Sequence, residues 1–238
     1  MNIDEPTIEN FAPQHGDRVD IVFYTDPLCC WSWAFQPIWH RFLQSYGDSV
    51  RFQLCMGGMI PDWETFNDPF NSIDRPAQMG PLWMHVAEMT GAQIDEQVWT
   101  RDAPSSSYPA CLAVKSAGLQ SERAGHLYLY VAQEAVMKDA LNISKREVLI
   151  QIAARLSEKY PNLFSCETFI NDFNNQAGIQ ALKADLEKVR YHKIGRFPTV
   201  TMTIKGQGLI LTGYRPFDVL EQAFIHVARS FTAASAAR

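Results

Sequence analysis

Two adjacent cysteines, Cys29 and Cys30, stand where a strand-like pattern gives way to a helix-like one, in the segment Asp26-Pro27-Leu28-Cys29-Cys30-Trp31-Ser32-Trp33. A helix N-terminus offers unpaired N–H groups and the positive end of the helix dipole, and both favour a thiolate over a thiol. The position predicts a nucleophilic thiolate on Cys29, with Cys30 and Ser32 in the first helical turn. The two cysteines would equally suit small buried apolar side chains, and this segment alone does not decide between the two interpretations.

A proline at the entrance of a later strand, Pro198 in Gly195-Arg196-Phe197-Pro198-Thr199, is the second feature that bears on the chemistry. A cis X–Pro bond is uncommon, and taken alone Pro198 fits an ordinary trans proline. If the fold brings this loop beside Cys29, a cis bond would turn the backbone of Phe197 toward the thiol. An extended substrate segment could then pair with that backbone.

The elements around Cys29 follow from hydrophobic periodicity. A short apolar, β-branched run predicts a strand over Val19–Tyr24, and helical spacing predicts a helix from Ser32 to about Gln44. Clean alternation predicts a second strand over Val50–Met56. Strand, helix and strand with short connections form a βαβ unit, which predicts a parallel pair with a right-handed crossover.

A long segment with almost no strand signal follows. We expect its helices at Pro76–Thr90, Ser107–Ala117, Arg123–Met137, Lys145–Lys159, Glu167–Asn174 and Gln176–Tyr191. Ser144 and Glu147 have the spacing of a capping box for the fourth of these helices. Strand patterns return at Thr199–Lys205 and Leu209–Thr212, and the glycine-containing turn between them predicts a hairpin. A last amphipathic helix follows.

The assembled order, β-α-β, helical insert, β-β-α, predicts an α/β protein with the thioredoxin fold and a large all-helical insertion. In that fold the loop before the third strand lies beside the cysteine at the first helix, which favours the cis bond at Pro198. We assign an N-terminal arm to residues 1–18, the thioredoxin-fold domain to 19–60 and 195–231, the helical insertion to 61–194 and a flexible tail to 232–238.

Charge and composition exclude several classes of function. A net charge of −5 and a pI of about 5.7 argue against a nucleic-acid surface. There is no run of eighteen apolar residues, so we expect no membrane span. The N-terminus lacks the pattern of a secretory signal, and five cysteines without zinc-ligand spacing predict thiols in a reducing compartment, the cytoplasm. We expect no metal site.

The cysteine motif resembles that of DsbA-like proteins, particularly the cytosolic FrnE-like and protein-disulfide-isomerase branch, where the pattern is Asp-Pro-x-Cys-x-Trp-Cys-Trp. The resemblance extends over roughly residues 19–229, through Met56-Gly57-Gly58-Met59, residues 107–115, Gly195-Arg196-Phe197-Pro198-Thr199 and Gly213-Tyr214-Arg215-Pro216-Phe217. It implies thiol-disulfide exchange with Cys29 as the nucleophile.

One departure from that family concerns the second cysteine of the motif, because this chain has Ser32 there. In the family this cysteine resolves the mixed disulfide with the substrate, and a hydroxyl cannot do so. Monothiol chemistry remains open: isomerisation, or deglutathionylation with free glutathione as the resolving thiol. Cys30, through a strained vicinal disulfide, and Cys55 are less favoured resolving thiols, and Cys111 and Cys166 are expected to be inert.

The motif also resembles that of kappa-class glutathione transferases and 2-hydroxychromene-2-carboxylate isomerases. Their motif is Ser-Pro-Tyr-Ser-Trp, and its catalytic serine falls on Cys29. This resemblance implies glutathione as a cofactor and a transferase or isomerase instead of a disulfide exchanger. A third alternative is a non-catalytic adaptor that uses the fold to bind a protein, as in related protease adaptors.

Our first hypothesis is a thiol-disulfide exchange enzyme with a single nucleophilic cysteine. In it Cys29 attacks, Ser32 hydrogen-bonds the thiolate and Pro198 guides the partner, while Trp31, Phe197 and Cys30 contact the substrate. The expected partners are protein or small-thiol disulfides, glutathione is a candidate ligand, and a homodimer is left open.

Overall fold

The structure is a computed structural model, and it describes residues 18–236, with side chains described up to residue 230. The N-terminal arm that we assigned to residues 1–18 therefore lies almost wholly outside the described residues. None of the helices in the described part of the chain is both long and apolar enough to cross a membrane.

A four-stranded sheet organises the fold, with β1 (Val19–Thr25), β2 (Val50–Met56), β3 (Thr199–Ile204) and β4 (Gln207–Thr212) in the order β2-β1-β3-β4. β1 and β2 are parallel, as the βαβ pattern predicts, and β3 and β4 form the expected antiparallel hairpin. β3 also pairs antiparallel with β1. This pairing brings the entrance of β3 beside the end of β1, where the cysteine motif begins.

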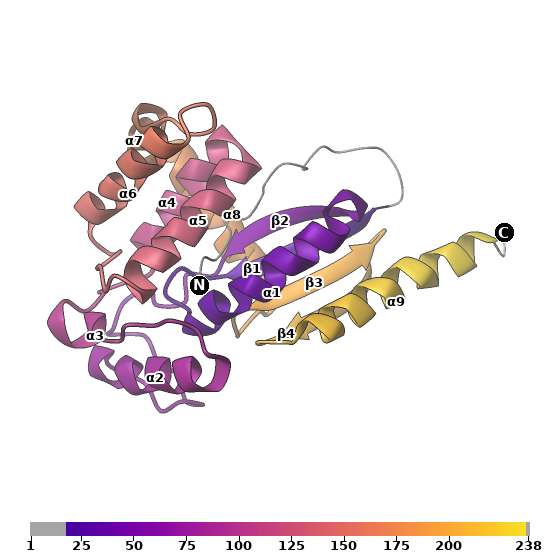
Figure 1. The fold of residues 1–238 in the computed structure, drawn as a ribbon, viewed down its shortest axis with the longest axis horizontal. Coiled ribbons are helices and arrows are strands. Elements are labelled where there is room, and N and C mark those ends of the chain that lie inside the picture. Colours follow the sequence, from indigo (N-terminus) through magenta and orange to yellow (C-terminus); the bar gives the residue numbers. More distant parts are fainter. Residues whose placement is uncertain (1–17, 237–238) are drawn as a thin grey trace.

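The two faces of the sheet are covered by different helices (Figure 1). α1 (Cys30–Tyr46) and α9 (Phe217–Ala236) lie on one face, where Phe23 of β1 packs against Phe35 and Trp39 of α1 at ring distances of 5.8 and 5.0 Å. α8 (Gln176–Tyr191) lies on the other face. There the Tyr24 hydroxyl is 2.5 Å from Nδ1 of His192, the residue after α8.

The segment between β2 and β3 is helical, and Figure 1 shows its helices gathered beside and below the sheet. After a 3₁₀ turn at Pro76–Gln78 come α2 (Met79–Thr90), α3 (Val98–Arg101), α4 (Tyr108–Gln120), α5 (Glu122–Met137), α6 (Arg146–Lys159), α7 (Cys166–Asn174) and α8. The six predicted helices are found with ends shifted by a few residues, and α8 has the predicted bounds. We did not predict α3, because a single turn contains too few residues to show a period.

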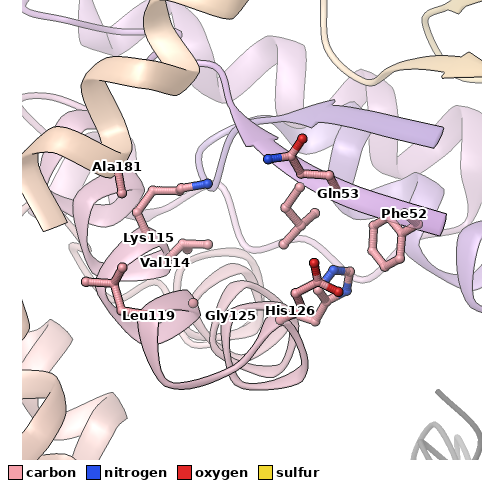
Figure 2. A pocket seen from close by; sticks show the side chains of 11 residues that line it. Phe52, Gln53, Val114, Lys115, Leu119, Gly125, His126 and Ala181 are labelled. Atoms are coloured by element: carbon pink, nitrogen blue, oxygen red, sulfur yellow. The ribbon is translucent and has the colours of Figure 1, made fainter. Parts of the chain in front are cut away.

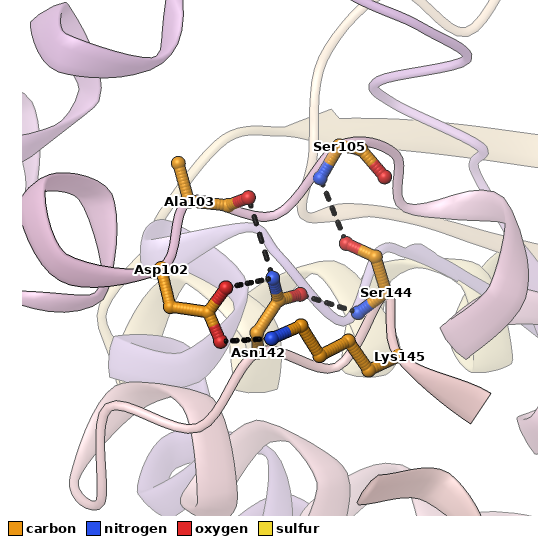
Figure 3. A network of polar contacts seen from close by, with 6 residues as sticks. All are labelled: Asp102, Ala103, Ser105, Asn142, Ser144 and Lys145. Atoms are coloured by element: carbon orange, nitrogen blue, oxygen red, sulfur yellow. Dashed lines mark hydrogen bonds and ion pairs between the residues drawn. The ribbon is translucent and has the colours of Figure 1, made fainter. Parts of the chain in front are cut away.

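The predicted capping box at Ser144 is wrong. Figure 3 shows the Ser144 hydroxyl accepting the Ser105 N–H at 2.8 Å, so it is not available to cap α6. Lys145 is the N-cap residue, makes no side-chain cap, and pairs with Asp102 at 2.7 Å. Asn142 donates to Asp102 at 3.2 Å and accepts the Ser144 N–H at 2.9 Å. These side chains join two loops instead of capping the helix.

The last helix is longer than we expected. α9 continues to Ala236, whereas we assigned residues 232–238 to a flexible tail. The segment after residue 231 is rich in alanine, which has the strongest intrinsic preference for helix. Residues 237–238 lie outside the described part of the chain.

Candidate functional site

Cys29 is the N-cap residue of α1, so its thiol lies at the N-terminus of that helix. Its backbone is extended, with φ −83° and ψ 108°, and its Sγ accepts the backbone N–H of Ser32 at 3.4 Å. The Cys29 N–H donates to the Asp26 carbonyl at 3.0 Å, which closes the turn between β1 and α1. The thiol therefore occupies the cap position that the sequence predicts, where it satisfies one of the unpaired N–H groups of the first turn.

The Pro198 loop lies directly against this thiol. The Phe197–Pro198 bond is cis, as predicted, and the thiol donates to the Phe197 carbonyl at 3.4 Å. Two further bonds fix the loop: Pro198 accepts the Gly213 N–H at 2.7 Å, and the Thr199 hydroxyl donates to the carbonyl of the residue before Phe197 at 2.8 Å. The fold thus brings together Cys29, Phe197 and Pro198 from segments about 170 residues apart.

Aromatic rings form the walls of the site. Trp31 is half-buried and lies 5.9 Å from the ring of Tyr214, which follows β4. The Phe197 ring covers Gly57, where an added Cβ would lie 2.3 Å from Phe197 Cζ. Only glycine at position 57 lets this ring close over the end of β2. Trp31 and Phe197 are both partly accessible, and their predicted substrate contacts stay predictions.

Four of the six predicted site residues are buried, Cys29, Cys30, Ser32 and Pro198. Cys30 is 2% exposed and packs in the hydrophobic core, so the predicted substrate contact for this residue is wrong. The helix turns its side chain inward. Ser32 is also fully buried. The Ser32 hydroxyl lies close enough to Cys29 to lower the pKa of its thiol. Among the described residues, however, this hydroxyl has no partner that meets ordinary hydrogen-bond geometry.

The electrostatics of the site oppose a thiolate on Cys29. The pKa of this thiol is raised to about 11, and burial is the largest cause. The nearby carboxylate of Asp26 also raises the pKa, while the hydroxyl and the amide of Ser32 lower it in part. The side chain is only 5% exposed. The predicted depressed pKa is therefore wrong, because loss of hydration outweighs the stabilisation by the helix N-terminus.

A buried carboxyl group beneath the site escaped the sequence analysis. Asp26 is fully buried, and its burial raises its pKa, while the hydrogen bonds that it accepts act in the opposite direction. The donors are the N–H groups of Leu28 (2.9 Å) and Met59 (2.7 Å), the Ser107 hydroxyl (2.9 Å) and the Cys111 thiol (3.4 Å). Asp26 therefore joins the turn before Cys29 to the segment after β2 and to the start of α4. The four donors all lie in the cysteine motif or in segments of the family resemblance, which is the signal that the sequence contains, but we assigned Asp26 no role of its own.

The five cysteines are all unpaired. Cys55, a less favoured resolving thiol, donates its Sγ proton to the Asp185 carbonyl of α8 at 3.5 Å, and burial raises its pKa to about 12. It is thus engaged on the sheet face opposite α1. Cys111 is buried against Asp26, and only Cys166 is half-exposed. The structure shows no second thiol hydrogen-bonded or bridged to Cys29.

A separate pocket of about 200 Å³ lies between β2, α4 and α5 (Figure 2). Lys115 extends into it, and its ammonium group is paired with buried Asp185 at 2.9 Å. None of the predicted site residues lines this pocket. Within residues 18–236 there is also no cluster of three or more histidine, cysteine or acidic side chains able to hold a metal ion. The candidate site is therefore the surface around Cys29.

Comparison with known proteins places this geometry in a family. A family model described as thioredoxin matches residues 22–222. The curated relatives include the ClpXP adapter protein SpxH of Halalkalibacterium halodurans, 26% identical over 86% of this chain, and that of Bacillus subtilis, 27% identical over 89%. The chain spans 66% and 69% of the lengths of these two relatives, about two thirds.

Solved structures show the same fold at lower identity. A Nitrosomonas europaea protein assigned as a disulfide isomerase is 21% identical, with a TM-score of 0.75 over 90% of this chain and 98% of the other. The cytosolic disulfide reductase DsbM of Pseudomonas aeruginosa is 19% identical, with 0.62 over 81% and 88%. A 2-hydroxychromene-2-carboxylate isomerase is 14% identical, with 0.63 over 90% and 98%. The family model, which covers most of the chain, shows that the chain belongs to the thioredoxin family.

Proposed function

We propose that this chain is a protein-binding adaptor, which presents the surface around Cys29 to a protein partner and delivers that partner to a protease such as ClpXP. The observation that carries the proposal is the state of Cys29, buried with a pKa of about 11 and followed by Ser32 where a second cysteine would resolve an intermediate. Binding through this surface needs neither a thiolate nor a second thiol.

Thiol exchange is unfavourable because very little of Cys29 is in the thiolate form at neutral pH. With a pKa of about 11, roughly one Cys29 side chain in ten thousand is a thiolate at pH 7. Exchange rates follow the thiolate fraction and the accessibility of the thiol, and both are low here. A mixed disulfide, once formed, would wait for an outside thiol. The relatives named ClpXP adapter protein SpxH, which align over most of this chain, support the same conclusion.

As part of this proposal we place the chain in the reducing cytoplasm, where its five unpaired cysteines would remain thiols. The proposal is tested with purified ClpXP, a reduced cell extract from the source organism and the purified chain. Quantitative mass spectrometry follows the loss of each protein with time. We expect at least one protein to be degraded faster when the chain is present. If the chain accelerates the loss of no protein, it is not an adaptor of this protease.

A second candidate function, monothiol exchange, is favoured by one observation: Cys29 Sγ accepts the Ser32 N–H and contacts the Phe197 carbonyl beside a cis proline. In this reaction the Cys29 thiolate attacks a disulfide, forms a mixed disulfide and expels the other sulfur as a thiolate. A glutathione thiolate then attacks the substrate-derived sulfur of the mixed disulfide, which forms a disulfide with glutathione and releases the Cys29 thiolate. Reduction of insulin and removal of glutathione from a glutathionylated peptide measure it. Activity that disappears in Cys29→Ala would establish this function.

Glutathione itself stays a candidate ligand, since one neighbour by fold is an isomerase of the class whose motif overlies Cys29. Calorimetric titration of the reduced chain with reduced glutathione tests this directly. Saturable binding would favour a glutathione-linked transferase or isomerase, and no detectable heat at millimolar glutathione would argue against one.

A further inference from the structure

Three exposed cations precede the Pro198 loop. Arg190, Lys193 and Arg196 lie at the end of α8 and in the segment that leads to Phe197, and all three are exposed. In a chain with a net charge of −5, three cations within seven residues form a local excess of positive charge. We call these residues, together with Phe70 and Tyr191, the basic rim.

Backbone hydrogen bonds fix the path of this segment. The Ile194 N–H donates to the Val189 carbonyl at 2.9 Å and the Lys193 N–H to the Arg190 carbonyl at 3.1 Å, so the chain closes the end of α8 in a tight turn with Lys193 at φ 53°. The Arg196 carbonyl accepts the hydroxyl that holds the start of β3. The cations therefore project from an ordered loop that ends at the Cys29 contact.

Asp62 and Asp68, two carboxylates of the loop before α2, are hydrogen-bonded within their own turns, and neither they nor Glu187 of α8 forms an ion pair with a rim cation among the described residues. The Asp62 carboxylate accepts the Thr65 N–H at 2.7 Å and the Thr65 hydroxyl at 2.8 Å. The Asp68 carboxylate accepts three donors of its own turn, from Phe70 and Asn71. Among the described residues no ion pair involves the three rim cations, while Arg51, Arg75, Lys115, Lys138 and Lys145 are paired.

Two exposed aromatic side chains complete the rim. Phe70 is 79% exposed, and its ring lies 3.9 Å from the Arg196 guanidinium, which it holds in place by a cation–π contact. Tyr191 is 83% exposed between the first two cations. Such large apolar side chains are seldom this exposed, and aromatic residues and arginine are the side chains enriched in protein interfaces.

We propose that the basic rim binds an acidic segment of a protein partner that also carries apolar side chains, next to Cys29. This inference rests on the proposed adaptor function and names the chemistry of its partner. Acidic side chains would pair with the three cations, and the apolar ones would pack on Phe70 and Tyr191. A small dicarboxylate such as glutathione offers only two carboxylates for three cations and no apolar group for the rings. The charge complementarity therefore favours a polypeptide.

The test uses a fluorescein-labelled peptide of about twelve residues, rich in glutamate with two phenylalanines, and fluorescence anisotropy with the full chain. The rim variant Arg190→Glu/Lys193→Glu/Arg196→Glu is compared with a control of equal charge change in the helical insertion, Arg101→Glu/Arg123→Glu/Arg155→Glu, whose arginines are also exposed. We expect the rim variant to lose at least about tenfold in affinity and the control less than about twofold. Added salt should weaken wild-type binding, since exposed charges are screened. Circular dichroism confirms that both variants are folded.

Three results would overturn the inference. They are equal loss in the rim and control variants, equal binding of a lysine-for-glutamate peptide, and full displacement by millimolar glutathione or by an oligonucleotide of equal charge. Other outcomes distinguish this inference from the adaptor proposal. If the peptide binds through the rim but ClpXP turnover is not accelerated, this inference stands and the adaptor function is wrong. If the rim variant accelerates turnover as well as wild type does, the inference is wrong and the adaptor function stands.

Discussion

The pH at which Cys29 reacts with an alkylating agent distinguishes a buried thiol from a catalytic thiolate. The perturbation is a rise in pH from 7 to 10 during reaction with iodoacetamide. A pKa of about 11 instead of 9.0 lowers the thiolate fraction at pH 7 about a hundredfold, because each pKa unit is a factor of ten. Only the thiolate attacks. The rate should therefore rise about tenfold per pH unit and show no plateau below pH 10.

The assay follows the peptide that contains Cys29 and Cys30 by mass spectrometry, with fragment ions to separate the two sites. Cys29→Ala identifies the signal, and circular dichroism shows whether the chain stays folded at each pH. At pH 7 we expect half-exposed Cys166 to be labelled before Cys29. A plateau between pH 7 and 9, with Cys29 labelled first, would show that the helix N-terminus outweighs burial. Cys29 would then be a reactive thiolate at neutral pH, and thiol exchange would be the favoured function.

Three substitutions test other parts of the site. Ser32→Cys supplies a second thiol next to Cys29, so we expect a disulfide under oxidising conditions but no substantial insulin reduction by either protein, because the proposed adaptor only binds its partner. Reduction clearly above wild type would favour thiol exchange, and equal and substantial reduction by both would mean that another thiol already resolves the intermediate. Gly57→Ala places a Cβ 2.3 Å from the Phe197 ring, and we expect about 1–3 kcal/mol of destabilisation in urea unfolding, whereas an unchanged midpoint would show that the ring moves freely. Asp26→Ala leaves several buried donors without an acceptor and should destabilise the chain by roughly 3 kcal/mol or more, and a loss below about 1 kcal/mol would show that the donors find other partners.

Hydrophobic periodicity predicted the strands and helices whose bounds depend on which side of the element is buried. The alternation over Val50–Met56 and the spacing over Gln176–Tyr191 gave β2 and α8 their bounds, because each pattern reports which side of one element is buried. The strand order placed Pro198 beside Cys29. Ser144 shows the limit: its spacing suits a cap, but a loop from elsewhere in the sequence supplies the N–H that it accepts.

The missing parts of the site depend on contacts between distant segments. The pKa of Cys29 is set by desolvation, for which the helix-start motif contains no signal, since the Pro198 loop that covers the thiol lies about 170 residues away. Asp26 collects donors from three segments separated by up to 85 residues. Cys30 is adjacent to Cys29 in sequence, but the helix turns its side chain into the core. Each outcome depends on tertiary packing, which periodicity does not describe.

The most direct test of the central claim, binding without thiol chemistry at Cys29, is the rate at which ClpXP degrades an identified client in the presence of Cys29→Ala. The client is a protein whose degradation the wild-type chain accelerates, and the buffer contains a reducing agent in both reactions. We expect Cys29→Ala to accelerate degradation to within about twofold of wild type, because removing a buried thiol leaves the surrounding surface in place. A rate that falls to the level without the chain, while the variant remains folded, would contradict the account and show that the thiol itself is required.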